Sequence, residues 1–339
     1  MKMLKNQQII DQLTLEQKAA LMSGKTEWQT AAVPGKVPAM FMSDGPHGLR
    51  KQEGEGDHLG LNASVVATCF PTAATLANSW DPQVTQSVGR ALGQEAKAHD
   101  VQVVLGPGMN TKRNPKCGRN FEYYSEDPQL AGTMAANEIN GAKKFGVYSY
   151  MKHFAMNNQE TNRMNSLNEW ANEQSIRETY LKPFRMAVED GHVMATMNAF
   201  NFIGDRWCGA NSNLLNNVLR GEWGYRGLVE TDYFVGMFMN SNAGLANGTD
   251  LMLSTNGAMG AKPQGMKNPT VVHQMRTASH NILYTTVNSN AYRKDAVKSA
   301  NAVTLPWKKR LYAIDVALVV VLILLECLVV YLDKRKFRD

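Results

Sequence analysis

The sequence predicts an α/β protein whose parallel sheet closes into an eight-stranded (β/α)8 barrel of the TIM type, followed by a single C-terminal transmembrane helix. Three observations lead to this prediction. Short apolar runs alternate with longer stretches of helical periodicity between residues 12 and 290, which is typical of a parallel sheet, open or closed. Several of these runs end in polar side chains, which a barrel gathers on one face and an open sheet spreads along an edge. An apolar run long enough to cross a bilayer follows at 311–332.

Apolar runs of strand length are separated by segments that have the periodicity of amphipathic helices. The predicted strands are 39–44, 66–71, 101–107, 147–154, 193–200, 227–232 and 249–253. The predicted helices are 81–98, 127–144, 170–190, 211–221 and 267–288. Two of the helices start at an Asp-Pro pair, Asp81-Pro82 and Asp127-Pro128, which places an N-cap residue before a proline in the first turn.

Composition excludes several classes of protein. Of the 339 residues, 44% are hydrophobic and 19% are charged, so the chain can bury a core and is not a disordered polyelectrolyte. The formal net charge of +6 comes from scattered basic residues, except at the C-terminus, and no nucleic-acid partner is expected. The first strand is not followed by GxGxxG, and the sequence has no P-loop, so nucleotide binding is unsupported. The four cysteines form no CxxC pair, so no metal site and no disulfide framework are indicated.

The apolar run at the C-terminus predicts a membrane anchor. It is flanked by basic clusters at 308–310 and 334–338, and a core helix of a soluble domain seldom runs this long without a polar face. The basic clusters are nearly balanced, so the positive-inside rule leaves the orientation open. Residues 1–24 lack the apolar region of a signal peptide, so the barrel would face the cytoplasm if the sequence is complete. The expected organisation is a barrel domain (1–295), a linker (296–310), a transmembrane helix (311–332) and a basic tail (333–339).

Polar side chains at the predicted strand ends indicate a binding site. Four strands carry them near their ends: Asp44, Lys152 with His153, Asn198, and Asp232. Asp232 loses hydration at the end of a buried strand and therefore needs a cation or a hydrogen-bond donor nearby. In a barrel it would meet Lys152, Arg119 and Arg50, and such a set can hold a sugar ring through bidentate hydrogen bonds. The alternative is a collection of unrelated caps and ion pairs.

Five segments resemble the motifs of glycoside hydrolase family 3, in the family's order and spacing. They are LTLEQKAALMSG (13–24), MSDGPHGLR (42–50), CGRNFEYYSEDP (117–128), MKHFAMNNQETNR (151–163) and LRGEWGYRGLVETDY (219–233). The resemblance covers residues 12 to about 295, which is the family's whole barrel domain. It looks like the β-glucosidase-type branch, because KHF at 152–154 is followed by Ala-Met-Asn-Asn and not by the KHFPGHG loop of the β-N-acetylhexosaminidase branch.

The resemblance implies retaining hydrolysis of β-glucosides or related β-glycosides, with no metal or cofactor. Asp232 matches the family's nucleophile, which attacks the anomeric carbon and forms a glycosyl-enzyme ester while a second carboxylic acid protonates the leaving oxygen. Asp44 matches the aspartate that binds the outer hydroxyls of the sugar. The other matching positions of the sugar site are Arg50, Arg119, Lys152, His153, Arg163 and Tyr233, the last of which stands where the family often has tryptophan.

Two departures from the family pattern concern catalysis. Met197 replaces a tyrosine whose hydroxyl would orient Asp232. The family's general acid/base usually comes from an α/β sandwich domain, and no segment of this sequence can form that domain. The acid could come from a separate domain or chain, as in a split or permuted enzyme. It could instead be Glu230, which points the same way as Asp232 on a strand, although an ion pair of Glu230 inside the barrel is the other interpretation. A rival function is a catalytically weak sugar-binding subunit or pseudoenzyme of a split glycosidase.

Overall fold

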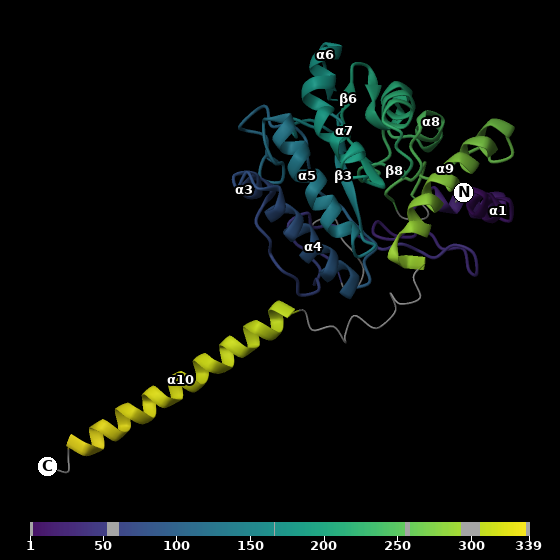
Figure 1. Cartoon of the computed structure of the whole chain (residues 1–339). Coiled ribbons are helices and arrows are strands. Elements are labelled where there is room, and N and C mark those ends of the chain that lie inside the picture. The colour runs from purple at the N-terminus through teal and green to yellow at the C-terminus, as the bar shows by residue number, and fades with distance from the viewer. Residues whose placement is uncertain (1–2, 53–60, 166, 255–257, 293–305, 337–339) are drawn as a thin grey trace. The chain divides into compact units, whose positions relative to one another are not determined.

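The computed structural model describes residues 3–52, 61–165, 167–254, 258–292 and 306–336. Two compact units make up the chain, Met1–Val297 and Lys298–Asp339. The first unit is an α/β fold in which helices cover the outside of a parallel sheet (Figure 1). The described part of the second unit is a helix.

The curled parallel sheet at the centre of the first unit confirms the predicted α/β fold. Its strands, hydrogen-bonded in this order, are β1 (Met42–Ser43), β2 (Val103–Val104), β3 (Tyr148–Phe154), β5 (Ala195–Asn198) and β8 (Leu228–Glu230). Beyond β8, parallel bridges join Glu230 to Leu251 and Met252 to Ser23. An antiparallel bridge then joins Gln29 to Phe41, immediately before β1. These bridges continue the pairing from β8 back toward β1, so the sheet curls around.

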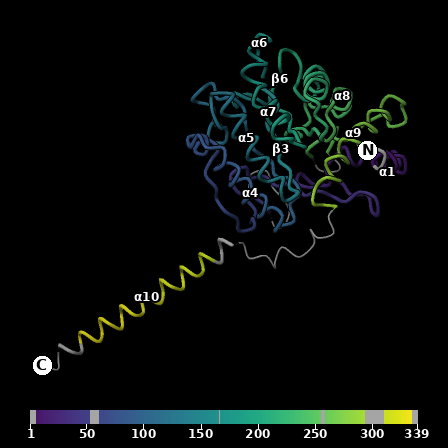
Figure 2. The backbone as a smooth tube through the Cα atoms, viewed as in Figure 1, coloured from purple at the N-terminus to yellow at the C-terminus, as the bar shows by residue number. Residues whose placement is uncertain are grey.

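Helices surround this sheet. They include one in each of the five predicted ranges, and further helices near the N-terminus, at 73–77 and at 241–247 that were not predicted. The helices of the first unit are α1 (Met3–Asp11), α2 (Leu15–Leu21), α3 (Ala73–Ala77), α4 (Pro82–Ala98), α5 (Pro128–Lys143), α6 (Glu173–Ser175), η1 (Ile176–Tyr180), α7 (Lys182–Glu189), η2 (Cys208–Ala210), η3 (Asn213–Glu222), α8 (Ser241–Asn247), α9 (Pro269–Asn288) and η4 (Asn290–Tyr292). The predicted Asp-Pro starts of α4 and α5 are confirmed, because Asp81 and Asp127 accept hydrogen bonds from the backbone N–H groups of Gln83 and Gln129. α1 lies beside α9, where Asp11 pairs with Arg276 (Figure 2).

Two glycines bring α4 and α5 into close contact. A Cβ atom on Gly89 would lie 2.1 Å from the backbone oxygen of Glu138, and one on Gly141 would lie 2.4 Å from that of Gln86. Because such distances are far below van der Waals contact, only glycine fits at this crossing. The crossing fixes α5, the helix that follows the loop carrying Arg119 and Glu122.

The core lies on both faces of the sheet, because side chains alternate along each strand. On β3, Tyr150 belongs to the apolar cluster with α1, α2 and α9, whereas Met151 belongs to the cluster under α5 and α7. On β8, Leu228 belongs to the cluster with α1, α2 and α9, and Val229 belongs to the cluster under α5 and α7. Glu230 therefore lies on the face of Leu228, next to Met197, its register partner on β5.

One predicted strand, 66–71, is wrong, because that segment forms an irregular loop. The loop is held by the N–H of Phe70, which donates to the oxygen of His47, and its Val66 is 79% exposed. A short apolar run ending in proline does not by itself distinguish a strand from a loop.

The predicted strand 249–253 pairs only through the isolated bridges at Leu251 and Met252. A second small sheet consists of β4 (Asn168–Glu169), β6 (Phe202–Ile203) and β7 (Arg206–Trp207).

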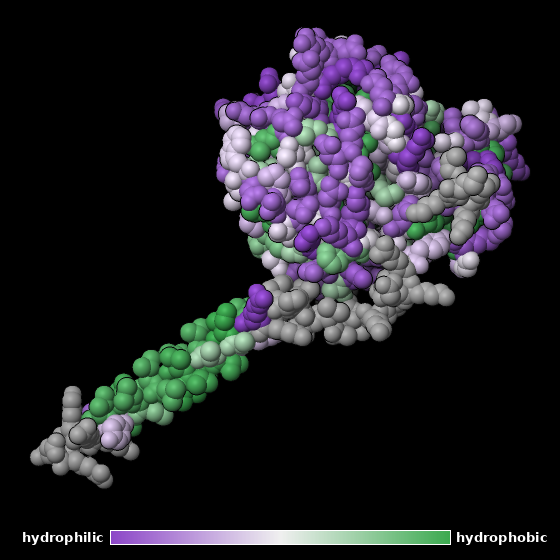
Figure 3. Space-filling model, in the orientation of Figure 1, coloured by the Kyte–Doolittle hydropathy of each residue, from purple (hydrophilic) through white to green (hydrophobic). Residues whose placement is uncertain are grey.

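The second unit contains α10 (Pro306–Lys336). Its segment Arg310–Asp333, 24 residues long, is long and apolar enough to cross a membrane by length and composition. Its described surface is strongly hydrophobic in Figure 3, where the visible face of the first unit is mostly hydrophilic. Much of the predicted linker 296–310, and the end of the predicted tail 333–339, lie outside the described residues.

Candidate active site

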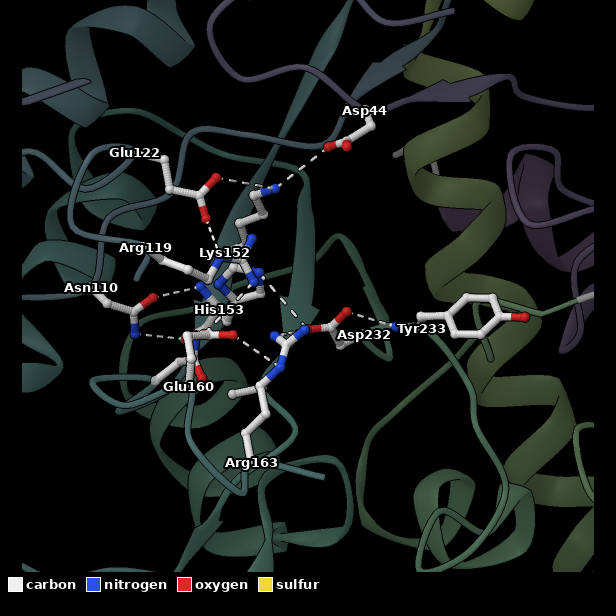
Figure 4. A network of polar contacts seen from close by, with 12 residues as sticks. Asp44, Asn110, Arg119, Glu122, Lys152, His153, Glu160, Arg163, Asp232 and Tyr233 are labelled. Carbon is white, nitrogen blue, oxygen red and sulfur yellow. Dashed lines mark hydrogen bonds and ion pairs between the residues drawn. The ribbon is translucent and has the colours of Figure 1, made fainter. Parts of the chain in front are cut away.

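Polar side chains from three strand ends meet at the carboxyl end of the sheet (Figure 4). Asp44 follows β1, Lys152 and His153 lie near the end of β3, and Asp232 follows β8 by two residues. Because these strands are parallel, their carboxyl ends come together. The Lys152 Nζ is 3.7 Å from the Asp44 Oδ1, and the His153 Nε2 is 3.8 Å from the Asp232 Oδ2.

Asp44 lies in a cluster of cations. The turn after β1 returns Arg50 to it, with Arg50 Nη2 3.5 Å from Asp44 Oδ2, and the turn needs glycine because Gly45 and Gly48 have φ angles of +114° and +144°. Burial raises the pKa of Asp44, but Lys152 and Arg50 lower it more, so its pKa lies below the ordinary value. Asp44 is therefore ionised at neutral pH and can accept hydrogen bonds from ligand hydroxyls.

Charges of alternating sign continue from Lys152 through the loop before α5. Lys152 Nζ lies 3.9 Å from Glu122 Oε2, and the other oxygen of Glu122 accepts from Arg119 Nε. Arg119 Nη1 lies 4.0 Å from Glu160 Oε1. Each cation in this buried region thus has a carboxylate close to it, which offsets the cost of removing the charges from water.

The chain of charges ends at Asp232. Glu160 Oε2 accepts from Arg163 Nε at 3.0 Å, and Arg163 Nη1 lies 3.7 Å from Asp232 Oδ2. Arg163 also stacks on the ring of Phe200, with its guanidinium carbon 4.7 Å from the ring centre, so its position is fixed by packing as well as by charge.

The two carboxyl oxygens of Asp232 differ. Oδ1 accepts the backbone N–H of Tyr233 at 2.7 Å. Oδ2 is buried and has no hydrogen-bond partner among the described residues, although His153 and Arg163 face it. The arrangement leaves one carboxyl oxygen held and the other available to react with a bound molecule or to bind one of its hydroxyls.

The side chain of Asn110 holds His153 through the backbone groups of His153. Its N–H donates to Asn110 Oδ1 at 2.7 Å, and its carbonyl accepts from Asn110 Nδ2 at 2.9 Å. Burial lowers the pKa of His153 well below the ordinary value, and the cations Arg119, Lys152 and Arg163 lower it further. The imidazole is therefore neutral at physiological pH.

A cavity of about 520 Å³ opens beside this cluster. Its walls include Asp44, Arg50, Arg119, Glu122 and Lys152. That volume is in the range of small-molecule sites, and charged groups on several sides suit a ligand with many hydroxyl groups. Ala67, Thr68 and Cys69, from the segment 66–71 that was predicted as a strand, form another part of the wall.

Glu230 does not join the cluster. Its side chain is fully buried, both carboxyl oxygens lack a hydrogen-bond partner, and no ion pair of it is found among the described residues. The expected ion pair inside the barrel is therefore absent from that part of the chain. Burial raises the pKa of Glu230 to about 8; the nearby Tyr150 hydroxyl lowers it and Asp232 raises it. Glu230 is mostly protonated at neutral pH and has no surface that a substrate could touch.

Three more predicted residues lie at the edge of the site. Met197 is buried, with 3% of its surface exposed, opposite Glu230. Asn198 is buried and donates to Thr249 Oγ1 at 2.8 Å, which ties it to the segment that follows α8. Tyr233 contributes its backbone N–H, whereas its ring extends away from Asp232 in Figure 4.

The sequence interpretation missed Glu122, Glu160 and Asn110. A signal was present for the first two, because Glu122 follows Arg119 by three residues and Glu160 precedes Arg163 by three, each inside a recognised motif. Buried cations call for carboxylates nearby. Asn110 lies in a loop and carried no such signal.

Residues 3–268 match the Glycosyl hydrolase family 3 N terminal domain. The chain belongs to glycoside hydrolase family 3. The matched segment contains all the residues of the cluster described above, from Asp44 to Tyr233.

Family 3 relatives are similar in sequence and in structure. The thermostable beta-glucosidase B of Acetivibrio thermocellus is 42% identical over 278 residues, which cover 81% of this chain and 36% of the relative. An exo-alpha-(1->6)-L-arabinopyranosidase of Bifidobacterium longum is 43% identical over 229 residues, covering 66% of this chain and 30% of the relative. The structure of beta-glucosidase 3B from Thermotoga neapolitana in complex with glucose superposes with a TM-score of 0.78 at 34% identity, covering 87% of this chain and 44% of that one. The chain thus spans about a third of the length of the curated family 3 relatives it matches.

Proposed function

We propose that this chain carries the nucleophile of a retaining glycosidase that acts on β-glucosides or related β-glycosides. The observation that carries the proposal is Asp232 Oδ2, which is free of hydrogen bonds among the described residues and faces His153 and Arg163. This oxygen bonds to the anomeric carbon as the bond to the aglycone breaks, and the leaving oxygen takes a proton from an acid. Water then attacks the same carbon, gives up a proton to the conjugate base, and releases the carboxylate.

The cations and carboxylates beside Asp232 would hold the sugar. Asp44 accepts from ring hydroxyls, while Lys152, Arg119, Arg50 and Arg163 donate to them. Metal and cofactor have no part in this chemistry. The names of the family 3 relatives support a glycoside substrate, and the two types of relative differ in the sugar they release, so the substrate class is proposed no more narrowly.

We also propose that the acid/base comes from a separate α/β sandwich domain or chain. The match covers 36% of the beta-glucosidase B relative, so a large part of that relative has no counterpart in this sequence. Complete burial of Glu230 argues against a local acid, because a proton donor must reach the leaving oxygen.

A second candidate function is a sugar-binding subunit of a split glycosidase with little catalysis of its own. Met197 favours it, because a thioether in place of the family's tyrosine removes a hydrogen bond to the nucleophile. Asp44 and the cations would still bind the sugar in that case.

We propose that residues 1–295 form a closed (β/α)8 barrel. A linker at 296–310, a transmembrane helix at 311–332 and a basic tail at 333–339 would follow it. The bridges that continue beyond β8 support closure. The exposed apolar side chains of α10 support a single-pass membrane anchor, since water would solvate them poorly.

An activated aryl β-glucoside tests the catalytic proposal, because its leaving group scarcely needs an acid. The full chain should release a burst of aglycone and gain the mass of one glycosyl group, and Asp232→Asn should abolish both. Asp205→Asn is the matched control, since Asp205 is exposed and pairs with Arg206, which is not part of the cluster. Sugar binding without burst or ester would favour the binding subunit, and an ester that survives Asp232→Asn would refute the assignment.

A further inference from the structure

The phenol of Tyr123 lies between two polar side chains behind the site. Its Oη accepts from Asn157 Nδ2 at 2.8 Å and lies 3.1 Å from His153 Nδ1. Tyr123, Asn157 and His153 are each only 1% exposed. The direction of each hydrogen bond is therefore decided by these side chains and their buried neighbours, and not by bulk water.

Glu160 fixes the direction of the first bond. Asn157 Nδ2 also lies 2.9 Å from Glu160 Oε1, and Glu160 is paired with Arg163. A carboxylate paired with a cation only accepts, so the amide must turn its NH2 group, and not its oxygen, toward Glu160. The same NH2 group then donates its second hydrogen to Tyr123.

Tyr123 accepts in this bond, so the proton of its own hydroxyl is still available for a second hydrogen bond. Burial raises the pKa of Tyr123, so the phenol keeps that proton. Asn157 already acts as donor to the phenol oxygen, which leaves His153 Nδ1 as the acceptor among the described residues. A neutral imidazole that accepts at Nδ1 carries its proton on Nε2.

We infer that Tyr123 is a positioning residue that fixes His153 as the Nε2–H tautomer and so presents an N–H donor beside Asp232. The 3.8 Å between Nε2 and Asp232 Oδ2 is too long for a direct hydrogen bond. The donor therefore serves an acceptor oxygen of the bound molecule, such as a sugar hydroxyl. The opposite tautomer would turn a lone pair toward the carboxylate and repel it. The inference rests on the proposed function only for the identity of that bound molecule.

The tautomer can be measured without any substrate. The full chain is labelled with 15N in its histidine side chains and kept in mild detergent, and long-range 1H–15N correlation spectra report which nitrogen carries the proton. His153→Gln assigns the signals. We expect the Nε2–H form in the parent chain and a substantial population of the Nδ1–H form in Tyr123→Phe.

Tyr124→Phe is the matched control. Tyr124 is buried next to Tyr123 in the sequence but donates to Glu138 Oε2 and not to His153, so its variant should keep the Nε2–H form. Thermal unfolding of both variants checks that the chain is folded. A parent chain protonated on Nδ1 would overturn the inference even if Tyr123→Phe fails to fold, and so would a Tyr123→Phe chain with an unchanged tautomer.

Kinetics then tests the consequence for the reaction. With the activated aryl β-glucoside, Tyr123→Phe should form the glycosyl ester about 3- to 10-fold more slowly, the range expected for one hydrogen bond. Tyr124→Phe should stay within about twofold of the parent chain. An unchanged rate in Tyr123→Phe would refute the positioning role. If the parent chain forms no ester, the proposed function fails, while the tautomer measurement still decides the inference.

Discussion

Glu230 on β8 is the register partner of Met197 on β5, so its carboxyl group lies beside a thioether. That carboxyl group has no hydrogen-bond partner among the described residues. The pKa of Glu230 is raised by this burial to about 8 from an ordinary value of 4.5. Between these two pH values the unfolded chain releases a proton that the folded chain retains. Glu230 therefore destabilises the folded state progressively as the pH rises through this window.

Glu230→Gln should remove this dependence on pH. Relative to the parent chain, its free energy of unfolding should rise by about 1.4 kcal/mol per pH unit between pH 5 and 8. Urea unfolding of both full chains in mild detergent measures the difference. Glu138 and Asp250 also have raised pKa values, about 7 and about 6, but they are the same in both chains and cancel in the comparison. Parallel stability curves for the two chains would show that Glu230 is ionised in the fold.

Asp232→Asn should bind glucose within about tenfold of the parent affinity. The amide keeps an oxygen to accept the N–H of Tyr233 and can still contact hydroxyls, whereas it cannot act as a nucleophile. Isothermal titration calorimetry measures the affinity, with Asp205→Asn as the control. A loss of more than about a hundredfold would mean that the charge of Asp232 holds the sugar cluster together.

The isolated chain should hydrolyse disaccharides far more slowly than activated aryl glycosides. An alkoxide leaving group needs a proton, and general acid catalysis contributes typically 10²–10⁴-fold. Adding a sandwich domain from a family 3 relative should restore the disaccharide rate selectively. If Glu230 is the acid, Glu230→Gln should cause the same selective loss and no partner should be needed. Full activity on a disaccharide in both the parent chain and Glu230→Gln would defeat both versions.

Removing residues from Leu311 onward should give a soluble domain that binds sugar like the full chain. The site residues all belong to the first unit, whereas Leu311 and the apolar residues after it belong to the second. Flotation with liposomes should separate the full chain from the shortened one, and calorimetry with glucose should not. Aggregation of the shortened chain would indicate that the helix stabilises the first unit.

The sequence was sufficient for the features that depend on local pattern. The Asp-Pro pairs correctly predicted the starts of α4 and α5, and the polar side chains at the predicted strand ends pointed to Asp44, Lys152 and Asp232. Pattern failed where tertiary contacts decide. The 66–71 run is apolar like a strand, yet its backbone bonds to the turn at His47 and it becomes part of the cavity wall.

Partners across long sequence separations were equally out of reach. Asn110 holds the backbone of His153 across 43 residues, and no periodicity or motif links the two. The face on which Glu230 lies could be predicted from its spacing to Asp232. Its lack of an ion pair could not, because the identity of its neighbours Met197 and Tyr150 depends on the order of the strands.

The alternation of charges from Asp44 to Asp232 has a consequence for how molecules arrive. The carboxylates Asp44, Glu122, Glu160 and Asp232 are matched in number by the cations Arg50, Arg119, Lys152 and Arg163, and His153 is neutral. These charged side chains create strong local electric fields, but their formal charges sum to zero. They therefore exert little electrostatic attraction on an ion several Debye lengths away. An uncharged sugar loses nothing by this, and its encounter rate with the cavity should be almost independent of ionic strength. Charged metabolites, by contrast, gain no electrostatic steering from these residues and must compete for the cavity by fit alone.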